Sequence, residues 1–269
     1  MSKDAYQIIT DSILKSLESN SPAWVKPWAT LSAPHNAISH KNYNGINRLV
    51  LGMSAHKSTG WLTYKQAQDA GGQVRKGETG TTVILFKPIN IKENNETVKS
   101  IPLMRAFSVF NVDQIDNLEL KIDVKPVTEF TSNEMADKLL AQATIEHGGD
   151  KACFIPSIDK IHMTIKSDFK TQSYYYATAL NELTHWSGHP SRLDRVKGSK
   201  FGDDAYAFEE LVAELGASFL CSDCGINGKL QHENYIASWI KVLKNDKKAI
   251  FNASSLARKS CEYLNQGGL

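Results

Sequence analysis

Three residues of one helical segment, Asn181, Glu182 and His185, have the types and almost the spacing of a metal-dependent hydrolytic site. Such a site needs two imidazoles four residues apart on one helix, because both nitrogens then reach the same ion. A Glu next to the first imidazole faces the metal-bound water as general base. Glu182 and His185 fit this pattern, but Asn181 stands where the first His is expected. A Glu and a His at this spacing also occur often by chance, so the pentapeptide alone does not establish a metal site.

The next helical segment supplies two carboxylates that strengthen this interpretation. Glu210 and Glu214 are four residues apart and therefore lie on one helix face. The small residues Ala213, Gly216 and Ala217 lie beside them, which lets two helices approach closely while an acid points between them. In metal sites of this kind one carboxylate is a ligand, and a second acid one turn on orients a ligand His. A solvated acidic face is the alternative interpretation.

Helical periodicity and stop signals predict the elements that carry these residues. A long helix spans about 171–187 and stops at Gly188, and a second spans about 206–221. A helix from about 132 that ends at Gly148–Gly149 and short strands at 152–155 and 160–163 precede them. Two further helices, at 235–243 and 249–264, follow. The C-terminal part is therefore expected to be mainly helical.

The N-terminal part has a mixed pattern. Helices are predicted at about 4–17, 46–55 and 63–70, and a strand at 80–86 pairs across a polar hairpin-like segment, 92–99, with a strand at 104–111. The segment 118–131 has little periodicity and reads as a linker. The fold class is therefore α+β, with an N-terminal domain at 1–125 and a C-terminal domain at 126–269.

Composition is that of a folded protein, with 41% hydrophobic and 22% charged residues. No apolar run approaches the roughly 20 residues that cross a bilayer, and the polar N-terminus has no signal-peptide pattern. A cytoplasmic protein without a membrane partner is therefore expected. Four cysteines form no disulfide framework, and the lone pair Cys221 and Cys224 is interpreted as buried thiols rather than a zinc site.

The charge is divided unevenly between the two parts. Residues 1–110 hold 13 Lys or Arg and 7 Asp or Glu, a balance of +6, whereas residues 111–269 hold 18 and 22, a balance of −4. A basic N-terminal part suggests an anionic partner. Single-stranded nucleic acid is held by basic grooves and by aromatic faces on which bases stack. The basic part contains both kinds of residue, and the candidate DNA contacts are Trp24, Lys26, Tyr43, Asn44, Asn47, Arg48, Trp61, Arg75, Lys76 and Lys87.

Several of these assignments have a structural alternative, since either Trp24 or Trp61 could be a core anchor instead. Trp61 adjoins a predicted element and fits a core position as well as a stacking one. Asn44 and Asn47 either hydrogen-bond bases or fix a turn. Arg48, Arg75 and Lys76 are the residues expected to contact phosphate. Since no groove-reading helix is present, readout is expected to be weakly sequence-specific.

Two long motifs resemble a known family. ELTHWSGHPSRLDR (182–195) and FGDDAYAFEELVAELGASFL (201–220) are similar to the metallopeptidase-like domain of ArdC-type antirestriction proteins, which also occurs in TraC-type plasmid primases. WVKPW (24–28), NAISHKNYNGINR (36–48), GWLTY (60–64) and GQVRKGETG (72–80) resemble that family's single-stranded-DNA-binding domain. The resemblance covers most of the chain in the right order.

The resemblance implies a zincin-like C-terminal domain whose metal ligands are position 181, His185 and Glu210, with Glu182 as general base. Glu214 is then either a residue that orients a ligand or one that exchanges roles with Glu210. A divalent metal, zinc in the first place, is the expected cofactor. Asn181 departs from the family pattern, and its neutral amide oxygen favours weaker zinc binding or a more oxygen-tolerant ion.

The function implied is antirestriction: the chain binds single-stranded DNA of a conjugative mobile element and protects it from host restriction endonucleases. One alternative is a DNA-directed zinc metallopeptidase that cuts a protein target. The other is an inactive zincin-fold module that contacts restriction endonucleases or another protein.

Overall fold

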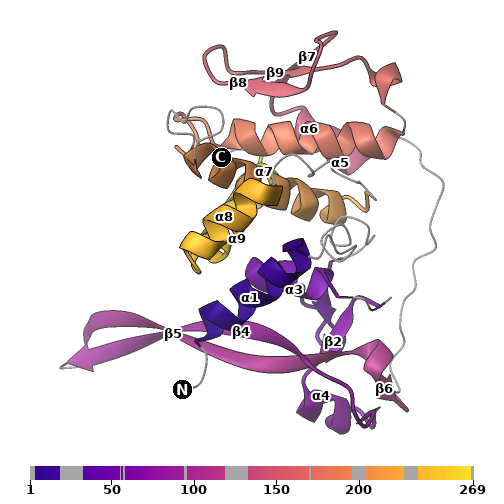
Figure 1. The fold of residues 1–269 in the computed structure, drawn as a ribbon, viewed down its shortest axis with the longest axis vertical. Coiled ribbons are helices and arrows are strands. Elements are labelled where there is room, and N and C mark those ends of the chain that lie inside the picture. The colour runs from indigo at the N-terminus through magenta and orange to yellow at the C-terminus, as the bar shows by residue number, and fades with distance from the viewer. Residues whose placement is uncertain are drawn as a thin grey trace.

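The computed structural model describes residues 4–18, 33–54, 56, 58–93, 96–118, 133–169, 171–195, 204–226 and 236–267, with the backbone alone at 86–93 and 96–103. In Figure 1 a sheet lies at the bottom, helices fill the middle and a smaller sheet covers the top. The predicted linker, apart from Leu118, and the predicted domain boundary at 125–126 lie outside the described residues.

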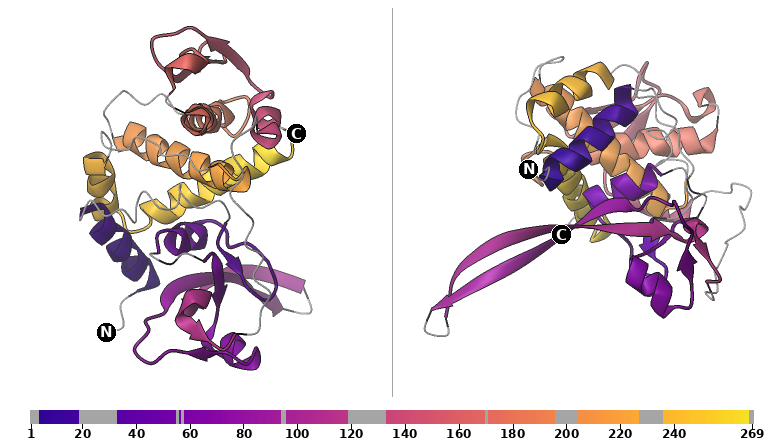
Figure 2. Two further views of the ribbon diagram at one scale, coloured as in Figure 1. Left: turned by 90° about the vertical axis from the view of Figure 1, so that its right-hand side faces the viewer. Right: turned by 60° about the horizontal axis from the view of Figure 1, so that its bottom comes forward.

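The lower sheet has four strands in the order β1 (His35–Asn36), β2 (Gly60–Leu62), β5 (Glu96–Asn111) and β4 (Thr81–Glu93). β1 and β2 are parallel and the other pairs are antiparallel. β4 and β5 form a long hairpin that projects from the body (Figure 2). A separate two-stranded sheet joins β3 (Gln73–Val74) to β6 (Ile115–Asp116).

The hairpin is longer than the sequence predicts. Pairing continues to Glu93 opposite Glu96, so most of the segment 92–99, expected as a polar connection, is strand. Charged residues are depleted in strands, but a continuous cross-strand ladder satisfies the backbone groups whatever the side chains are.

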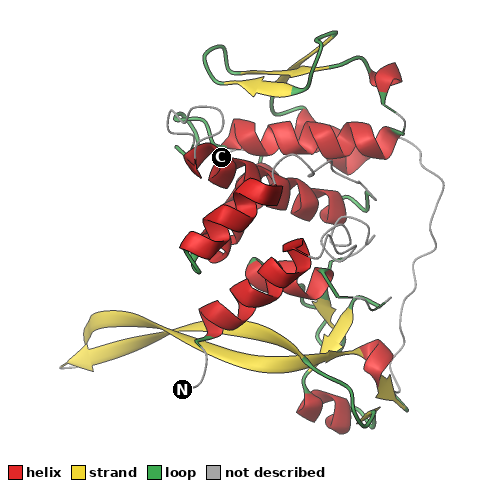
Figure 3. Ribbon diagram, in the orientation of Figure 1, coloured by secondary structure: helices red, strands yellow, loops and turns green. Residues whose placement is uncertain are grey.

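The helices lie mainly in the middle layer (Figure 3). They are α1 (Ala5–Glu18), α3 (Ile46–Gly52), α4 (Tyr64–Asp69), α5 (Glu134–Leu140), α6 (Gln172–Ser187), α7 (Asp204–Asp223), α8 (Ile236–Asn245) and α9 (Ala249–Asn265), with short 3-10 turns at Val112–Gln114 and Lys166–Asp168. Every predicted helix is present, and the predicted α+β class with a mainly helical C-terminal part is confirmed. Among the described segments, no helix is both long and apolar enough to cross a bilayer.

The prediction that the helix after residue 132 runs to Gly148 is wrong. α5 ends at Leu140, and β7 (Thr144–His147) follows it. Thr144 and Ile145 are β-branched and favour the strand. β7 pairs in parallel with β9 (Lys160–Met163), and β8 (Cys153–Ile155) pairs antiparallel with the other side of β9. This sheet covers α6 (Figure 1).

One hydrophobic core joins the two predicted domains. Ile9 and Ile13 of α1 and Leu49 of α3 belong to the same buried cluster as Leu215 of α7 and Ile250 of α9. A smaller cluster (Leu51, Trp61, Val83 and Val109) lies on the sheet beneath. Because α1 and α3 complete the core of the helical layer, the two parts are packed as one body.

Candidate functional site

The candidate metal site lies where α6 and α7 cross. Thr171 caps α6 by accepting a hydrogen bond from the Tyr174 backbone. Gly216 of α7 lies against Thr184 of α6, and a Cβ at Gly216 would come within 2.5 Å of Thr184 Cγ2. The expectation that small residues beside the acids allow close helix approach is confirmed at Gly216.

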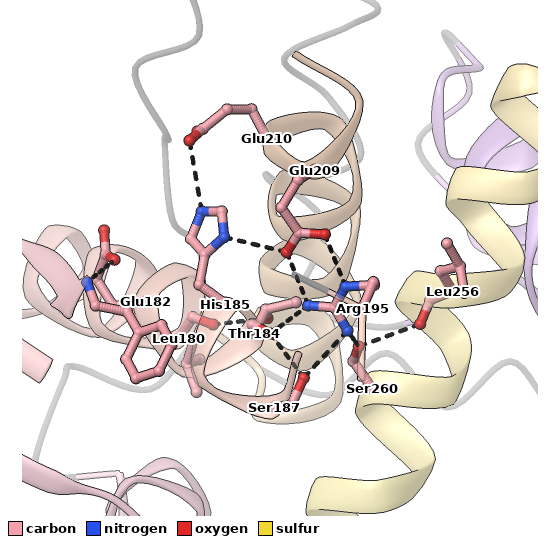
Figure 4. Close-up of polar contacts among 11 residues, drawn as sticks. Leu180, Glu182, Thr184, His185, Ser187, Arg195, Glu209, Glu210, Leu256 and Ser260 are labelled. Carbon is pink, nitrogen blue, oxygen red and sulfur yellow. Dashed lines mark hydrogen bonds and ion pairs between the residues drawn. The ribbon is translucent and has the colours of Figure 1, made fainter. Parts of the chain in front are cut away.

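His185 lies between two neighbouring carboxylates of α7. Its Nδ1 is 3.2 Å from Glu209 Oε1, and its Nε2 is 3.7 Å from Glu210 Oε1 (Figure 4). All three side chains are largely buried. The structure therefore brings the predicted ligands His185 and Glu210 together.

Glu209 is in turn fixed by Arg195, as Figure 4 shows. The guanidinium donates to Glu209 Oε2 at 2.8 Å and Oε1 at 3.0 Å, to the Thr184 carbonyl at 2.6 Å and to Ser260 Oγ at 2.7 Å. Arg195 thus joins α6, α7 and α9. Glu209 and Arg195 both lie within the two long C-terminal motifs, but no role was predicted for either residue.

The loop after α6 holds Arg195 in this position. Arg192 lies 3.8 Å over the Trp186 ring, donates to the Trp186 carbonyl at 2.7 Å and forms a two-contact ion pair with Asp159. The Arg195 backbone N–H donates to the Gly188 carbonyl at 2.8 Å. These contacts explain why the segment between Gly188 and Arg195 turns back onto α6.

Glu182 is held by the upper sheet. Its Oε2 accepts a hydrogen bond of 2.8 Å from the Phe154 backbone N–H in β8. Burial raises the pKa of Glu182, and the nearby Glu210 and Glu214 act in the same direction, although His185 and the Phe154 N–H oppose them. A raised pKa is the property that a carboxylate needs to accept and return a proton.

The charges around His185 favour its protonated form. Burial alone would lower the pKa of His185, but the hydrogen bond to Glu209 and the carboxylates of Glu182, Glu209 and Glu210 raise it to about 9. Burial raises the pKa of Glu209, but His185 and Arg195 outweigh it and the net pKa is lowered. The pKa of Glu210 is raised, first by burial. A metal ion at Nε2 must therefore displace a proton that Glu209 and Glu210 stabilise.

The donor set fits a metal ion in part. Two ligands of one tetrahedral zinc ion are about 3.4 Å apart, close to the 3.7 Å between His185 Nε2 and Glu210 Oε1. Asn181, the third predicted ligand, is buried and carries a neutral amide oxygen. In the described part of the chain, no group of three His, Cys, Asp or Glu residues is placed to hold one ion. Glu214 is also buried, one turn beyond Glu210. The structure therefore brings together two of the predicted ligands, His185 and Glu210, and the third predicted ligand is a weaker donor.

The predicted DNA-contact residues separate into two groups. Arg75 and Lys76 line a surface groove together with the rings of Tyr64 and Phe110. Tyr64 is 45% exposed and lies edge-on to Phe110, with ring centroids 6.2 Å apart. Arg75 makes ion pairs with Glu78 and Asp116, and Lys76 is exposed.

The other described candidates have structural partners or lie elsewhere. Arg48 is only 8% exposed; it donates to the Phe219 carbonyl at 2.9 Å and pairs with Asp223 at 2.8 Å. Asn47 exchanges two hydrogen bonds with the Ile84 backbone, so of the two interpretations it fixes the local structure. Trp61 is buried in the smaller core cluster, with Tyr43 packed against that cluster.

Arg48 and Trp61 therefore correct the expected DNA surface, because neither side chain is accessible to a strand. Asn44 is exposed at a different groove, beside α9. Trp24, Lys26 and the Lys87 side chain lie outside the described residues.

Two family models match the chain. The N-terminal domain of anti-restriction factor ArdC matches residues 3–110, and a zincin-like metallopeptidase matches residues 134–256. A DNA primase TraC of Escherichia coli is 37% identical over 97% of this chain, but the match spans only 27% of that protein. The uncharacterized protein y4eC of Sinorhizobium fredii is 32% identical over 97% of this chain and 91% of its own length.

Solved structures agree with these matches. The metal-free crystal structure of antirestriction protein ArdC from plasmid R388 is 38% identical, covers 99% of this chain and 98% of its own, and superposes with a TM-score of 0.82. The Mn(II)-bound structure of the same protein is 37% identical, with the same coverage and TM-score. At this identity, and with nearly complete coverage of both chains, the protein belongs to the ArdC family of antirestriction proteins.

Proposed function

We propose that this protein binds single-stranded DNA in the cytoplasm and protects incoming DNA from host restriction endonucleases. The observation that carries the proposal is the groove in which Tyr64, Arg75 and Lys76 meet Phe110. It combines one exposed ring, that of Tyr64, with cations, as sites that bind single strands without sequence preference do. The positive balance of residues 1–110 supports an anionic ligand.

The residues of this groove have different roles in the proposal. The exposed ring of Tyr64 offers a stacking surface, and stacking contributes about 1–3 kcal/mol per base. Lys76 contacts phosphate. Arg75 is held by Glu78 and Asp116, and it also donates to the Asp113 carbonyl at 2.6 Å, so it shapes the groove more than it neutralises a phosphate.

A salt-dependent gel shift that compares single-stranded with duplex DNA tests the binding proposal. We expect Tyr64→Ala to weaken single-strand binding by about tenfold or more, and Lys76→Ala to weaken it and reduce its salt dependence. Lys65→Ala is the matched control, because Lys65 is exposed next to Tyr64 but does not line the groove. Equal affinity for both DNA forms, or an equal effect of all three substitutions, would contradict the proposal.

Protection from restriction is tested in cells. The transfer of unmodified plasmid DNA into a restricting host is measured with the wild-type chain, Tyr64→Ala and Lys65→Ala. We expect Tyr64→Ala to lose protection and Lys65→Ala to keep it. Full protection by a variant that no longer binds single strands would refute the link between the two activities.

A second proposal is a divalent-metal site with peptidase activity, favoured by the spacing of His185 and Glu210 and by the zincin-like family match. In it His185, Glu210 and weakly Asn181 hold the ion, and Glu182 is the general base. A bound ion supplies Lewis-acid activation of water. Two oxygen donors and one nitrogen suit manganese at least as well as zinc, and the related ArdC of plasmid R388 has been solved with Mn(II).

Metal analysis of the purified protein decides this second proposal. We expect Asn181→His to retain one ion per chain, the wild type to retain less, and Asn181→His combined with His185→Ala to retain none. If neither the wild type nor Asn181→His holds an ion, the site is vestigial. Protection that survives Glu182→Ala would then favour DNA binding alone, or a module that contacts restriction endonucleases through the zincin-like surface.

A further inference from the structure

A second groove, between α9 and the N-terminal half, has the composition of a nucleotide site. Its walls come from α1, the turn before α3, β4 and α9, and it encloses about 400 Å³. This volume lies within the range of pockets that hold small ligands. The residues that matter for its chemistry are Tyr6, Asn44, Lys248, Phe251, Asn252 and Arg258. None of them lines the Tyr64 groove, and only Asn44 was a predicted DNA contact.

Two cations of α9 line this groove. Lys248 stands at the start of the helix and is exposed, and Arg258 follows ten residues, about 15 Å, further along it. Within the described residues, the Lys248 ammonium has no hydrogen-bonded carboxylate, and it lies 5.4 Å from the centre of the Tyr6 ring. Arg258 pairs with Glu262 one turn on but remains 41% exposed. Lys248 is therefore available to a phosphate, and Arg258 would bind one in exchange for its contact with Glu262.

The rest of the groove matches the other parts of a nucleotide. The Tyr6 ring is fixed edge-on against Phe251, with centroids 4.6 Å apart, and so forms a preordered flat surface. The exposed amides of Asn44 and Asn252 each combine donors with an acceptor, as the edges of bases do. Asn47, in contrast, has its amide committed to the Ile84 backbone.

We propose that this groove binds two successive nucleotides of a single strand, with Lys248 and Arg258 at neighbouring phosphates and Tyr6, Asn44 and Asn252 beside the bases. The proposal takes its ligand class from the proposed single-strand binding and adds a second site to it. A nucleotide here touches both halves of the molecule. It also touches α9, whose Ser260 holds the Arg195 guanidinium that fixes Glu209 and, through it, His185.

Calorimetric titration of the full chain with a thymidine dinucleotide that carries a terminal phosphate tests this site. We expect the double variant Lys248→Ala and Arg258→Ala to bind the dinucleotide about a hundredfold more weakly, since each of the two lost charge-assisted contacts is worth about tenfold. The matched control is Lys247→Ala with Lys259→Ala. It removes the same charge from neighbouring positions that do not line the groove. Because Lys247 pairs with Asp4, next to the start of α1, this control also tests whether loosening α1 is enough to weaken dinucleotide binding.

Photo-crosslinking locates the bound strand. An oligothymidylate with a photoreactive thymine is expected to crosslink to Tyr6 or Phe251 in the wild type and not in the Lys248 and Arg258 variant. The idea is overturned if that variant binds the dinucleotide as the control does, if inorganic phosphate binds as tightly as the dinucleotide, or if crosslinks are confined to the Tyr64 groove. Failure of the proposed function is a different result, in which the wild type binds no single-stranded oligonucleotide at all.

Discussion

The carboxylate of Glu209 lies between two cationic groups, His185 on one side and Arg195 on the other. Arg195 is the less replaceable of the two. Its side chain is only 5% exposed, and four of its donors reach three different helices. A Lys at this position could not match the planar fork that holds both oxygens of Glu209.

We predict that Arg195→Ala lowers the free energy of unfolding by about 3–5 kcal/mol, because it leaves a buried carboxylate without its main partner. Urea unfolding of the metal-free protein measures the loss. Adding Glu209→Gln should restore part of it, because the unpaired charge is removed. A double variant as unstable as the sum of its single substitutions would show that the two side chains do not interact.

The ion pair of Arg192 with Asp159 makes a pH-dependent contribution that can be tested. The hydrogen bonds from Arg192 hold the pKa of Asp159 below its usual 3.8. Because the folded-state pKa is lowered, the stabilisation is present above the unfolded value of 3.8 and is lost as the pH falls through the folded value.

We therefore expect Asp159→Asn to be less stable than the wild type at neutral pH, and the difference to shrink as the pH falls below 3.8. Urea midpoints measured across this range report the difference. A gap that stays constant down to the acid limit would mean that the Arg192 contact to Asp159 adds no charge-dependent stability.

On the scale of secondary structure, the crossing of α6 and α7 depends on a residue without a side chain. In an ordinary helix, replacing Gly by Ala is stabilising by about 1 kcal/mol. Gly216→Ala should instead be destabilising by about 1–3 kcal/mol, because the new Cβ meets Thr184 at 2.5 Å. Chemical denaturation gives the sign directly. Thr184→Ala in the same chain should recover most of the loss, and a stabilised single variant would contradict the observed helix contact.

The longer helices could be predicted because they have a sustained apolar periodicity, and α6 also has a clear stop at Gly188. The strands β1, β2, β3 and β6 have two or three residues each, too few for an alternation to be seen. β7 was taken for the end of α5 because Gly148 looked like a helix stop. The short strands depend on pairing with partners distant in the sequence, such as Trp61 with Asn111, which a local pattern does not contain.

The candidate site was predictable in its helices but not in its contacts. The spacing of Glu182 and His185, with Glu210 on the next helix, selected the right pair of elements. Glu209 was missed because adjacent helix residues such as Glu209 and Glu210 point about 100° apart. Only the position of the His185 imidazole decides which of the two carboxylates contacts it. His185 in fact lies between Glu209 and Glu210 and uses one nitrogen for each.

On the scale of the whole molecule, residues of both halves share one hydrophobic core. Arg48 was expected at the DNA because it lies in a basic, aromatic segment. It instead packs over the Phe219 ring, 5.0 Å from its centre, and binds Asp223 near the end of α7. Solvent exposure depends on tertiary packing, so the local sequence could not distinguish a phosphate contact from this interior ion pair.

The last prediction separates these two roles for Arg48. If the residue joins the halves, Arg48→Ala should lower the free energy of unfolding by about 2–3 kcal/mol, somewhat less than a fully buried pair costs because the Asp223 side chain is 25% exposed. Its affinity for single-stranded DNA and the salt dependence of that affinity should stay unchanged. If it contacts phosphate, the slope of log affinity against log salt should fall by about 0.7, the value for one phosphate contact on a single strand.

Lys76→Ala serves as the comparison in the same titration, because it should change the salt slope and leave stability nearly unaltered.

Since α1 and α3 share the core of the helical layer, the wild type is also expected to unfold in one cooperative transition. Arg48→Ala should lower its midpoint without splitting it, because Ile9, Ile13 and Leu49 remain packed against α7 and α9. Two resolved transitions in the wild type would mean that the shared core does not couple the two halves.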